Sequence, residues 1–256
     1  MKQEYADLIA KEFEDCVRST ILRTSGEDTY RPFHSALLSD EALFWSRFER
    51  SFSTSFGQRV IEKISKIAAL SNDATHAINQ KSTIIQLPSS QLKGIENHLQ
   101  RLRNSNSGQI ANWQTDVNEL LNIPHSEDVE EVRVISDLWW LKDGVNHYLS
   151  IKTVKPNIDQ TAEAKRDLLK LKLFDPQAKV YFGLYYNPYG ESKTDYAWGP
   201  PKKIFNFNQD ESVLIGKEYW DTLGGIDFYE EVIAIAARVG KLTRQLIFEM
   251  SQSQNF

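Results

Sequence analysis

Apolar residues in the first third of the chain recur at helical spacing. Residues 2–22 carry them at i, i+3 and i+4 intervals, which predicts one long amphipathic helix. The positions are Tyr5, Leu8, Ile9, Phe13 and Val17. Two further helices are expected in 36–52 and 57–70, separated by a break at SFSTSFG (51–57).

Polar sequence follows and predicts helices or loops through 72–104. Within it, SSQLKGIENHLQRL (89–102) begins with serines suited to a helix N-cap. The run RNSNSG (103–108) is typical of a mobile loop. ANWQTDVNELLN (111–122) predicts one more helix, which ends before Pro124.

After Pro124 the pattern becomes that of an α/β protein. VRVISDLWWL (132–141) and VNHYLSIKTV (145–154) are β-branched and aromatic, and both predict strands. DQTAEAKRDLLKLKLF (159–174) predicts a helix and AKVYFGLYYN (178–187) a buried strand. The chain ends with a long amphipathic helix, expected from Asp227 to Ser251.

This order of elements predicts an α/β fold with a central mixed β-sheet flanked by helices, plus a helical N-terminal region. We divide the chain into a helical part, 1–124, and a core, 125–256. The two parts are expected to pack as one continuous globule. The N-terminal helices and the long C-terminal helix are candidate surfaces for a dimer.

The two strands after Pro124 can be placed in register from their turn. Asp143-Gly144 between such runs is a strong signal for a two-residue hairpin turn. Asp137 then lies opposite Ser150, with Cβ atoms roughly 5 Å apart. Lys152 shares that face, because side chains along a strand alternate with period two.

An acid, a small hydroxyl and a lysine on one patch of sheet suit phosphodiester hydrolysis. Carboxylates hold Mg²⁺, which polarises a phosphoryl oxygen and lowers the pKa of an attacking water. A nearby lysine stabilises the developing negative charge or orients that water. The pattern therefore predicts a magnesium-dependent nuclease centred on Asp137 and Lys152.

At these residues the sequence resembles the PD-(D/E)xK nuclease superfamily. It departs from the signature twice, since Ser136 replaces the proline and Ser150 takes the place of the second acid. Some similar enzymes carry Ser-x-Lys and recruit a glutamate from the following helix. By that resemblance, Glu163 is the expected second metal ligand, with Asp167 one turn later on the same side.

Glu62 and Ser150 have two interpretations each. Glu62 lies in GQRVIEKISKI (57–67) and is a candidate further metal ligand, as a helical glutamate is in similar nucleases; it also fits a solvated helix face. Ser150 could attack the phosphate or fill space beside the metal, and the second is expected because no His or Asp is placed by sequence to activate its hydroxyl.

Longer segments make the resemblance more specific. They are RPFHSALLS, FERSFSTSFGQ, LSIKTVKPN, AKRDLLKLK, YYNPYGESKTDYAWG and LIGKEYWDTLGG, spread over residues 31–225. Together they resemble the TdeIII-type family of type II restriction endonucleases. The resemblance implies double-strand cleavage of DNA at a short GC-rich palindrome of the GGNCC kind. A palindromic target is read by a two-fold symmetric protein, so a homodimer is expected.

Candidate DNA contacts lie in two places. Lys155 and Lys165 flank the expected site and suit phosphate contact. YYNPYGESKTDYAWGPPKK (185–203) combines aromatics, amides and lysines, as reading of base edges requires. The candidates in it are Asn187, Lys193, Asp195, Tyr196 and Trp198. The alternative is a solvent-exposed loop with a tryptophan packed in the core.

Composition sets limits on location and partners. The 256 residues carry 30 basic and 35 acidic side chains, a net charge of −5. Residues 152–172 are locally basic, with six basic and three acidic side chains. Cys16 is the only cysteine, which favours a reducing cytoplasm. No stretch approaches the roughly 18 apolar residues of a membrane helix, and the acidic amphipathic N-terminus does not resemble a secretory signal.

Two rival functions fit the same fold. One is a non-specific or structure-directed nuclease, which would cut random-sequence DNA. The other is a catalytically inactive DNA-binding module, for which Ser150 in place of an acid is the motive. Metal-dependent turnover separates the binding module from an enzyme, as does a rise in melting temperature with Mg²⁺ or Ca²⁺.

Overall fold

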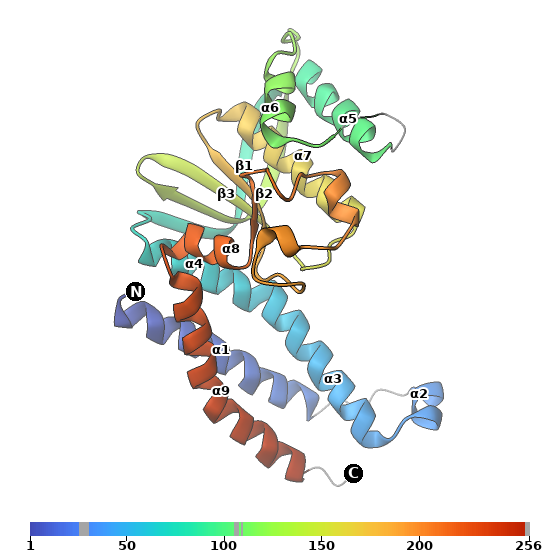
Figure 1. The fold of residues 1–256 in the computed structure, drawn as a ribbon, viewed down its shortest axis with the longest axis vertical. Helices are drawn as coiled ribbons and strands as arrows, with labels where there is room; N and C mark the ends of the chain where they lie inside the picture. Colours follow the sequence, from blue (N-terminus) through green and yellow to red (C-terminus); the bar gives the residue numbers. More distant parts are fainter. Residues whose placement is uncertain (26–30, 105–107, 109, 254–256) are drawn as a thin grey trace.

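A mixed β-sheet forms the centre of the molecule in the computed structural model, which describes residues 1–25, 31–104, 108 and 110–253. Its strands, in sheet order, are β1 (His76–Pro88), β2 (Val129–Lys142), β3 (Val145–Lys152), β4 (Lys179–Leu184) and β5 (Val213–Ile215). β1, β2 and β3 are antiparallel, whereas β3, β4 and β5 are parallel. The predicted mixed α/β fold is confirmed (Figure 1).

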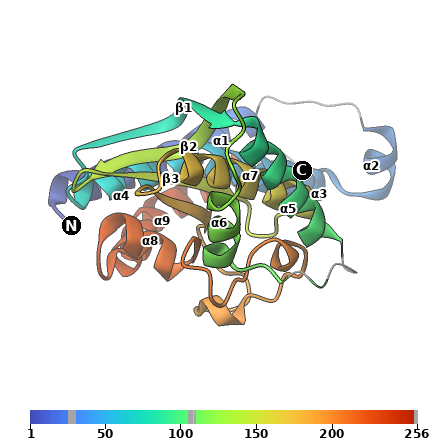
Figure 2. The same cartoon turned by 90° about the horizontal axis from the view of Figure 1, so that it is seen from above.

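Helices cover both faces of this sheet. One face packs against α5 (Ser89–Arg103), α6 (Trp113–Leu121) and α7 (Ile158–Phe174). The other packs against α4 (Ile61–Ser71) and α8 (Lys217–Gly224). Figure 2 shows the sheet between the two groups.

A helical arm extends away from the sheet (Figure 1). It contains α1 (Gln3–Thr24), α3 (Asp40–Ser55) and α9 (Phe228–Ser253), with the short α2 (Pro32–Leu37) at its far end. The predicted N-terminal and C-terminal helices are thereby confirmed. No helix within the described ranges is long and apolar enough to span a membrane.

The hairpin between β2 and β3 has the predicted register. The ladder runs from Lys142↔Val145 to Leu138↔Leu149. Its turn residues have positive φ, 52° at Asp143 and 74° at Gly144. Two adjacent positive φ angles define the type I′ turn, which Asp-Gly tolerates at low cost.

Two predictions between the first helix and β1 were wrong. The break expected at 51–57 does not occur, because a π-helical turn, Phe56–Val60, joins α3 to α4. The segment 72–104 contains not only a helix but the 13-residue strand β1. β1 pairs with β2 along its length, so part of the region 1–124 belongs to the central sheet.

Two smaller expectations have different outcomes. The helix in 89–102 is present as α5, but no side chain caps it, and Pro88 occupies its N-cap position. The loop predicted at 103–108 falls largely on residues 105–107, which lie outside the described residues.

Midway along both β1 and β2, the side-chain alternation shifts by one residue. Odd and even positions therefore exchange the faces of the sheet to which they point. In β1, Ala77 packs on the α4 side and Ile85 on the α7 side, although both positions are odd. In β2, Leu138 and Val134 are divided in the same way. Strict period-two alternation would put each pair on one face. In β1 the change coincides with Gln80, whose φ is 51°.

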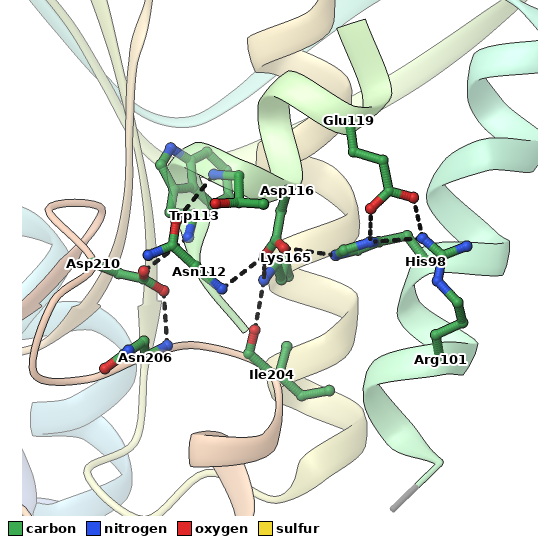
Figure 3. A network of polar contacts seen from close by, with 11 residues as sticks. His98, Arg101, Asn112, Trp113, Asp116, Glu119, Lys165, Ile204, Asn206 and Asp210 are labelled. Atoms are coloured by element: carbon green, nitrogen blue, oxygen red, sulfur yellow. Dashed lines mark hydrogen bonds and ion pairs between the residues drawn. The ribbon is translucent and has the colours of Figure 1, made fainter. Parts of the chain in front are cut away.

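A buried ionic network fixes α7 to its neighbours (Figure 3). Lys165 of α7 is fully buried; its Nζ donates to Asp116 Oδ2 at 2.5 Å and to the Ile204 carbonyl at 2.6 Å. His98 Nε2 of α5 lies 3.3 Å from Asp116 Oδ1. The network therefore ties α5, α6, α7 and the segment at Ile204 together.

The carboxyl of Asp116 is held in its charged form. Burial alone would raise its pKa, but the contact with His98 and the charge of Lys165 outweigh burial and hold the pKa below its usual value. Lys165 has two oxygen acceptors, and its Nζ lies 4.9 Å from the centre of the Phe205 ring. We therefore describe the pair as an ammonium and a carboxylate.

Substituting one partner of this pair will destabilise the protein. Asp116→Asn leaves the Lys165 ammonium buried without its counter-charge, so the free energy of unfolding is expected to fall by about 3–5 kcal/mol. Denaturant titration measures it. Asp116→Asn combined with Lys165→Met should recover part of the loss. Lys63→Ala, which breaks the exposed pair with Glu12, is the control and should cost less than about 1 kcal/mol.

The same pair predicts a pH dependence. Because the folded pKa of Asp116 is lowered, its stabilisation is complete above the unfolded pKa and is lost as pH falls through the folded pKa. The stability difference between wild type and Asp116→Asn should therefore shrink in acid. Denaturation at a series of pH values checks this, and a difference that grew in acid would contradict it.

Candidate active site

A cleft of about 330 Å³ lies between the sheet and α7. Five of the residues predicted for catalysis line it: Asp137 from β2, Ser150 and Lys152 from β3, and Glu163 and Asp167 from α7. The strands and the following helix therefore bring these side chains to one cavity, as the hairpin register implied.

Asp137 lies where β2 and β3 separate. The backbone ladder stops at Leu138↔Leu149, and the next N–H of β3, that of Ile151, donates to Asp137 Oδ2 at 2.6 Å. A side-chain carboxylate thus replaces the backbone carbonyl as acceptor. The bond fixes the orientation of the carboxylate relative to β3.

Two further groups of β3 surround the same oxygen. Ser150 Oγ donates to Asp137 Oδ2 at 3.4 Å, and Lys152 Nζ lies 4.0 Å from it. The Lys152 side chain is 25% exposed, so its ammonium remains accessible from the cleft. A lysine in this position can contact a phosphate oxygen while remaining close to the acid.

Glu62 of α4 approaches Asp137 from the other side of the sheet. The amide of Gln80 connects them, because its Nε2 donates to Glu62 Oε2 at 3.0 Å and to Asp137 Oδ1 at 3.2 Å. Asn79 connects the main chains, since its Nδ2 donates to the carbonyls of Glu62 at 2.8 Å and Asp137 at 3.2 Å. Glu62 is therefore not simply part of a solvated helix face.

The environment of Glu62 favours its protonated form more than water does. Burial raises the pKa of this carboxyl, and the negative charge of Asp137 raises it further. The hydrogen bond from Gln80 and the charge of Lys152 act in the opposite direction. A cation near both acids would relieve the repulsion between them.

The donor set fits a small divalent cation. Among the described residues, no group of three or more Asp, Glu, His or Cys side chains is arranged to hold a metal ion. Mg²⁺, however, keeps several waters and is commonly held by one or two carboxylates. Glu62 and Asp137 both direct an oxygen at one point, which the Gln80 nitrogen occupies. Two hard oxygen donors around one point suit this ion.

The acids of α7 stand on the opposite wall of the cleft. Glu163 is exposed, and Asp167 pairs with Lys170 at 3.1 Å on the same helix. Glu163 is thus the freer of the two to turn toward a ligand in the cleft.

The comparisons with known proteins agree with this chemistry. The sequence model of the type II restriction endonuclease family HinfI matches residues 1–240. The chain belongs to this family. The type II restriction enzyme HgiEI of Herpetosiphon aurantiacus is 28% identical over 243 residues, which cover 92% of this chain and 86% of the relative. HgiCII of the same organism is 26% identical over 253 residues, covering 95% and 91%.

The prediction of a type II restriction endonuclease is therefore confirmed, and the family that matches is named for HinfI. Members cut DNA at specific sites, so this chain is a site-specific endonuclease. Such an enzyme must contact both the DNA backbone and the base edges.

Lys155 is well placed for the backbone. It is exposed, three residues after Lys152, and its Nζ lies 5.5 Å from the centre of the Tyr189 ring and 5.7 Å from that of Trp198. Trp198 Nε1 in turn donates to the Pro156 carbonyl at 2.8 Å. The aromatic rings thus hold the lysine in the segment that follows β3 in this HinfI-family protein.

Two predicted DNA contacts are buried instead. Lys165 is in the network of Figure 3, so its ammonium points into the core rather than toward a phosphate. Tyr196 is 1% exposed; it stacks on Phe207, and its hydroxyl donates to the Val154 carbonyl at 2.9 Å. Both side chains fill interior sites that the sequence pattern did not reveal.

Three other predicted base-reading residues bond within their own loop or to neighbouring segments. Asn187 Nδ2 donates to the Ser192 carbonyl at 2.7 Å, and Asp195 Oδ2 accepts the Ser192 N–H at 3.1 Å. Lys193 Nζ donates to the Asp210 carbonyl at 2.9 Å and pairs with Glu218 at 3.3 Å. In this conformation their polar atoms shape the loop.

Sequence reasoning missed Asn79, Gln80 and Tyr189. The first two lie in β1, which was not expected to be a strand. Tyr189 is 39% exposed and presents the face of its ring to Lys155. Its signal was its place in the aromatic segment 185–203, where Tyr196 and Trp198 were chosen instead.

Removal of Lys155 should weaken DNA binding without changing sequence preference. Lys155→Ala deletes one expected phosphate contact, so affinity should fall for all sequences and the slope of log K against log salt should drop by about 1. Binding titrations at several salt concentrations measure both.

Lys179→Ala is the matched control for this change. Lys179 is an exposed lysine of β4. Its backbone is paired with that of His147 in β3, at the end of these two strands that lies away from Lys152. It should leave the salt slope unchanged. Equal effects of the two substitutions would contradict a specific role for Lys155.

Proposed function

We propose that this chain is a magnesium-dependent homodimeric restriction endonuclease that cuts both strands of a short GC-rich palindrome of the GGNCC kind. The observation that carries the proposal is the placement of Glu62 and Lys152 near the two oxygens of Asp137, whose side chain lines the cleft. Such a cluster is the arrangement that phosphodiester hydrolysis requires.

Each side chain has a distinct role in this proposal. Asp137 is the central metal ligand, oriented by the Ile151 N–H. Glu62 and Glu163 supply further oxygens from the two sides, and Asp167 stands behind Glu163. Lys152 neutralises charge that develops on the phosphate or orients the water. Ser150 donates to Asp137 and fills the space that a second acid would occupy.

Mg²⁺, when bound, would supply Lewis-acid polarisation of the phosphate and a more acidic water. The protein itself positions the DNA and the catalytic groups. The cleft walls hold the DNA backbone near Lys152, and the sheet keeps Asp137 fixed while the phosphate is in place. Fixed groups need little reorganisation during the reaction, which is why their stabilisation of charge is large.

The proposed dimer follows from the target. A palindrome presents the same sequence on both strands, so two copies related by a two-fold axis can each cut one strand. The helical arm supports this assembly. An apolar groove of about 540 Å³ is lined by residues of α1, α3 and α9, and Leu22 and Phe248 on the arm are exposed. We expect the enzyme to act in the cytoplasm, where the unpaired Cys16 stays reduced.

Plasmid cleavage tests the function directly. The protein is incubated with a plasmid of known sequence rich in GC palindromes, with Mg²⁺ or with EDTA, and the ends are mapped. Discrete fragments that require Mg²⁺ are expected. A smear would indicate a non-specific nuclease, whereas no cleavage of any such DNA would indicate an inactive binding module.

Lys152→Ala should abolish cleavage but preserve binding. Loss of one group that stabilises the developing charge typically lowers the rate by about 10²–10³-fold. Cleavage assays and gel-shift binding measure the two effects separately. Lys142→Ala, at the turn of the same hairpin, is the control and should cut normally. Wild-type cleavage by Lys152→Ala would refute the assignment.

Substituting the candidate acids one at a time identifies the second ligand of the metal. Glu62→Gln and Glu163→Gln each keep the size of the side chain and remove its charge. We expect both to raise the Mg²⁺ concentration needed for half-maximal cleavage, while Asp167→Asn, already paired with Lys170, has a smaller effect. An unchanged requirement in Glu62→Gln would remove Glu62 from the metal site.

A further inference from the structure

The side chain of Gln80 occupies the point where the two acids meet. Its Nε2 is 3.0 Å from Glu62 Oε2 and 3.2 Å from Asp137 Oδ1. An amide NH₂ has two hydrogens, and here both are directed at carboxylate oxygens. We call these two hydrogen bonds the amide bridge.

The backbone of β1 is distorted to place this side chain. Gln80 has a φ of 51°, in the left-handed region that residues with a side chain adopt only at an energetic cost. The ladder between β1 and β2 also omits the pair Gln80 and Asp137, although its neighbours Asn79↔Leu138 and Lys81↔Ser136 are paired. Strain of this kind is often found at functional sites.

The neighbouring Asn79 has a separate task. It donates to the carbonyls of Glu62 and Asp137, so it holds their main chains together and leaves their carboxylates free. Asn79 is half-buried, whereas Gln80 is exposed. The side chain of Gln80 can therefore swing into solvent while the two acids remain in place.

A cation and the amide bridge exclude each other. Mg²⁺ binds oxygen at about 2.0–2.1 Å, well inside the hydrogen-bond lengths of the bridge. An ion shared by Glu62 and Asp137 would thus overlap the Gln80 nitrogen.

We propose that Gln80 is a positioning residue that takes the place of the metal between Glu62 and Asp137 and must swing out when a divalent cation binds. This inference rests on the proposed metal site. The bridge separates two like charges in the metal-free protein and keeps the acids aimed at one point. It also weakens metal binding, because the competent state is only the fraction of molecules in which the bridge is open.

Direct titration of the DNA-free protein with Mg²⁺ tests this, by calorimetry and by the metal-induced rise in melting temperature. Gln80→Gly removes the amide and also relieves the positive φ. If the bridge is closed about nine-tenths of the time, the Mg²⁺ Kd of this variant should be about 10-fold lower than that of wild type. Gln80→Glu, which places a third carboxylate there, should lower the melting temperature without metal and bind Mg²⁺ more tightly still.

Gln86→Gly is the matched control. Gln86 is an exposed residue of the same strand, six residues further along and paired with Glu131. It should leave the Mg²⁺ Kd unchanged. A glutamine with only a structural role would, on removal, leave or weaken metal binding, so a gain in affinity is specific to the proposal.

The outcomes separate this inference from the proposed function. Mg²⁺ binding by wild type that is lost in Asp137→Ala but unchanged or weaker in Gln80→Gly would overturn the role of Gln80 and leave the metal site intact. Absence of Mg²⁺ binding in wild type and in every Gln80 variant would overturn both. Tighter binding in Gln80→Gly and Gln80→Glu, with Gln86→Gly unchanged, would establish the role.

Discussion

The hydrogen bond from the Ile151 N–H to Asp137 is the contact on which the arrangement of the site depends. It ends the ladder between β2 and β3 and replaces a backbone acceptor by a carboxylate. Because the bond crosses two strands, it sets the position of Asp137 relative to Ser150 and Lys152, the two residues that flank Ile151. Loss of a partner is costly for an N–H that is partly shielded from water, so the fold itself holds the acid in place.

The second constraint is the buried pair of Lys165 and Asp116. Its lysine is on α7, two residues from both Glu163 and Asp167, and points away from the cleft that those acids line. One face of α7 therefore packs in the core, and another face lines the cleft. The orientation of the acids follows from the need to keep the ammonium paired in the core.

The parts of the structure that local chemistry determines could be predicted from the sequence. Asp143-Gly144 fixes a two-residue turn, and the turn fixes the register that brings Asp137, Ser150 and Lys152 together. β1 could not be predicted in this way. Its alternation changes phase at Gln80, so no single period of two runs through it.

The positions of residues that depend on contacts with distant parts of the chain could not be predicted from the sequence either. Lys165 looks like a surface lysine until Asp116, 49 positions earlier, is placed against it. Glu62 reaches the site because α4 packs on β1, which the sequence pattern did not reveal. Tyr196 is buried because Phe207 and the Val154 carbonyl lie beside it. The aromatic segment thus fastens the loop after Lys152.

The π-helical turn has a mechanical consequence. It makes α3 and α4 one uninterrupted rod from Asp40 to Ser71, whose far end lies in the helical arm (Figure 1). At 1.5 Å per residue, Glu62 sits roughly 33 Å along this rod from Asp40. In the proposed homodimer, a contact made at the arm would bear on the same continuous helix that carries Glu62.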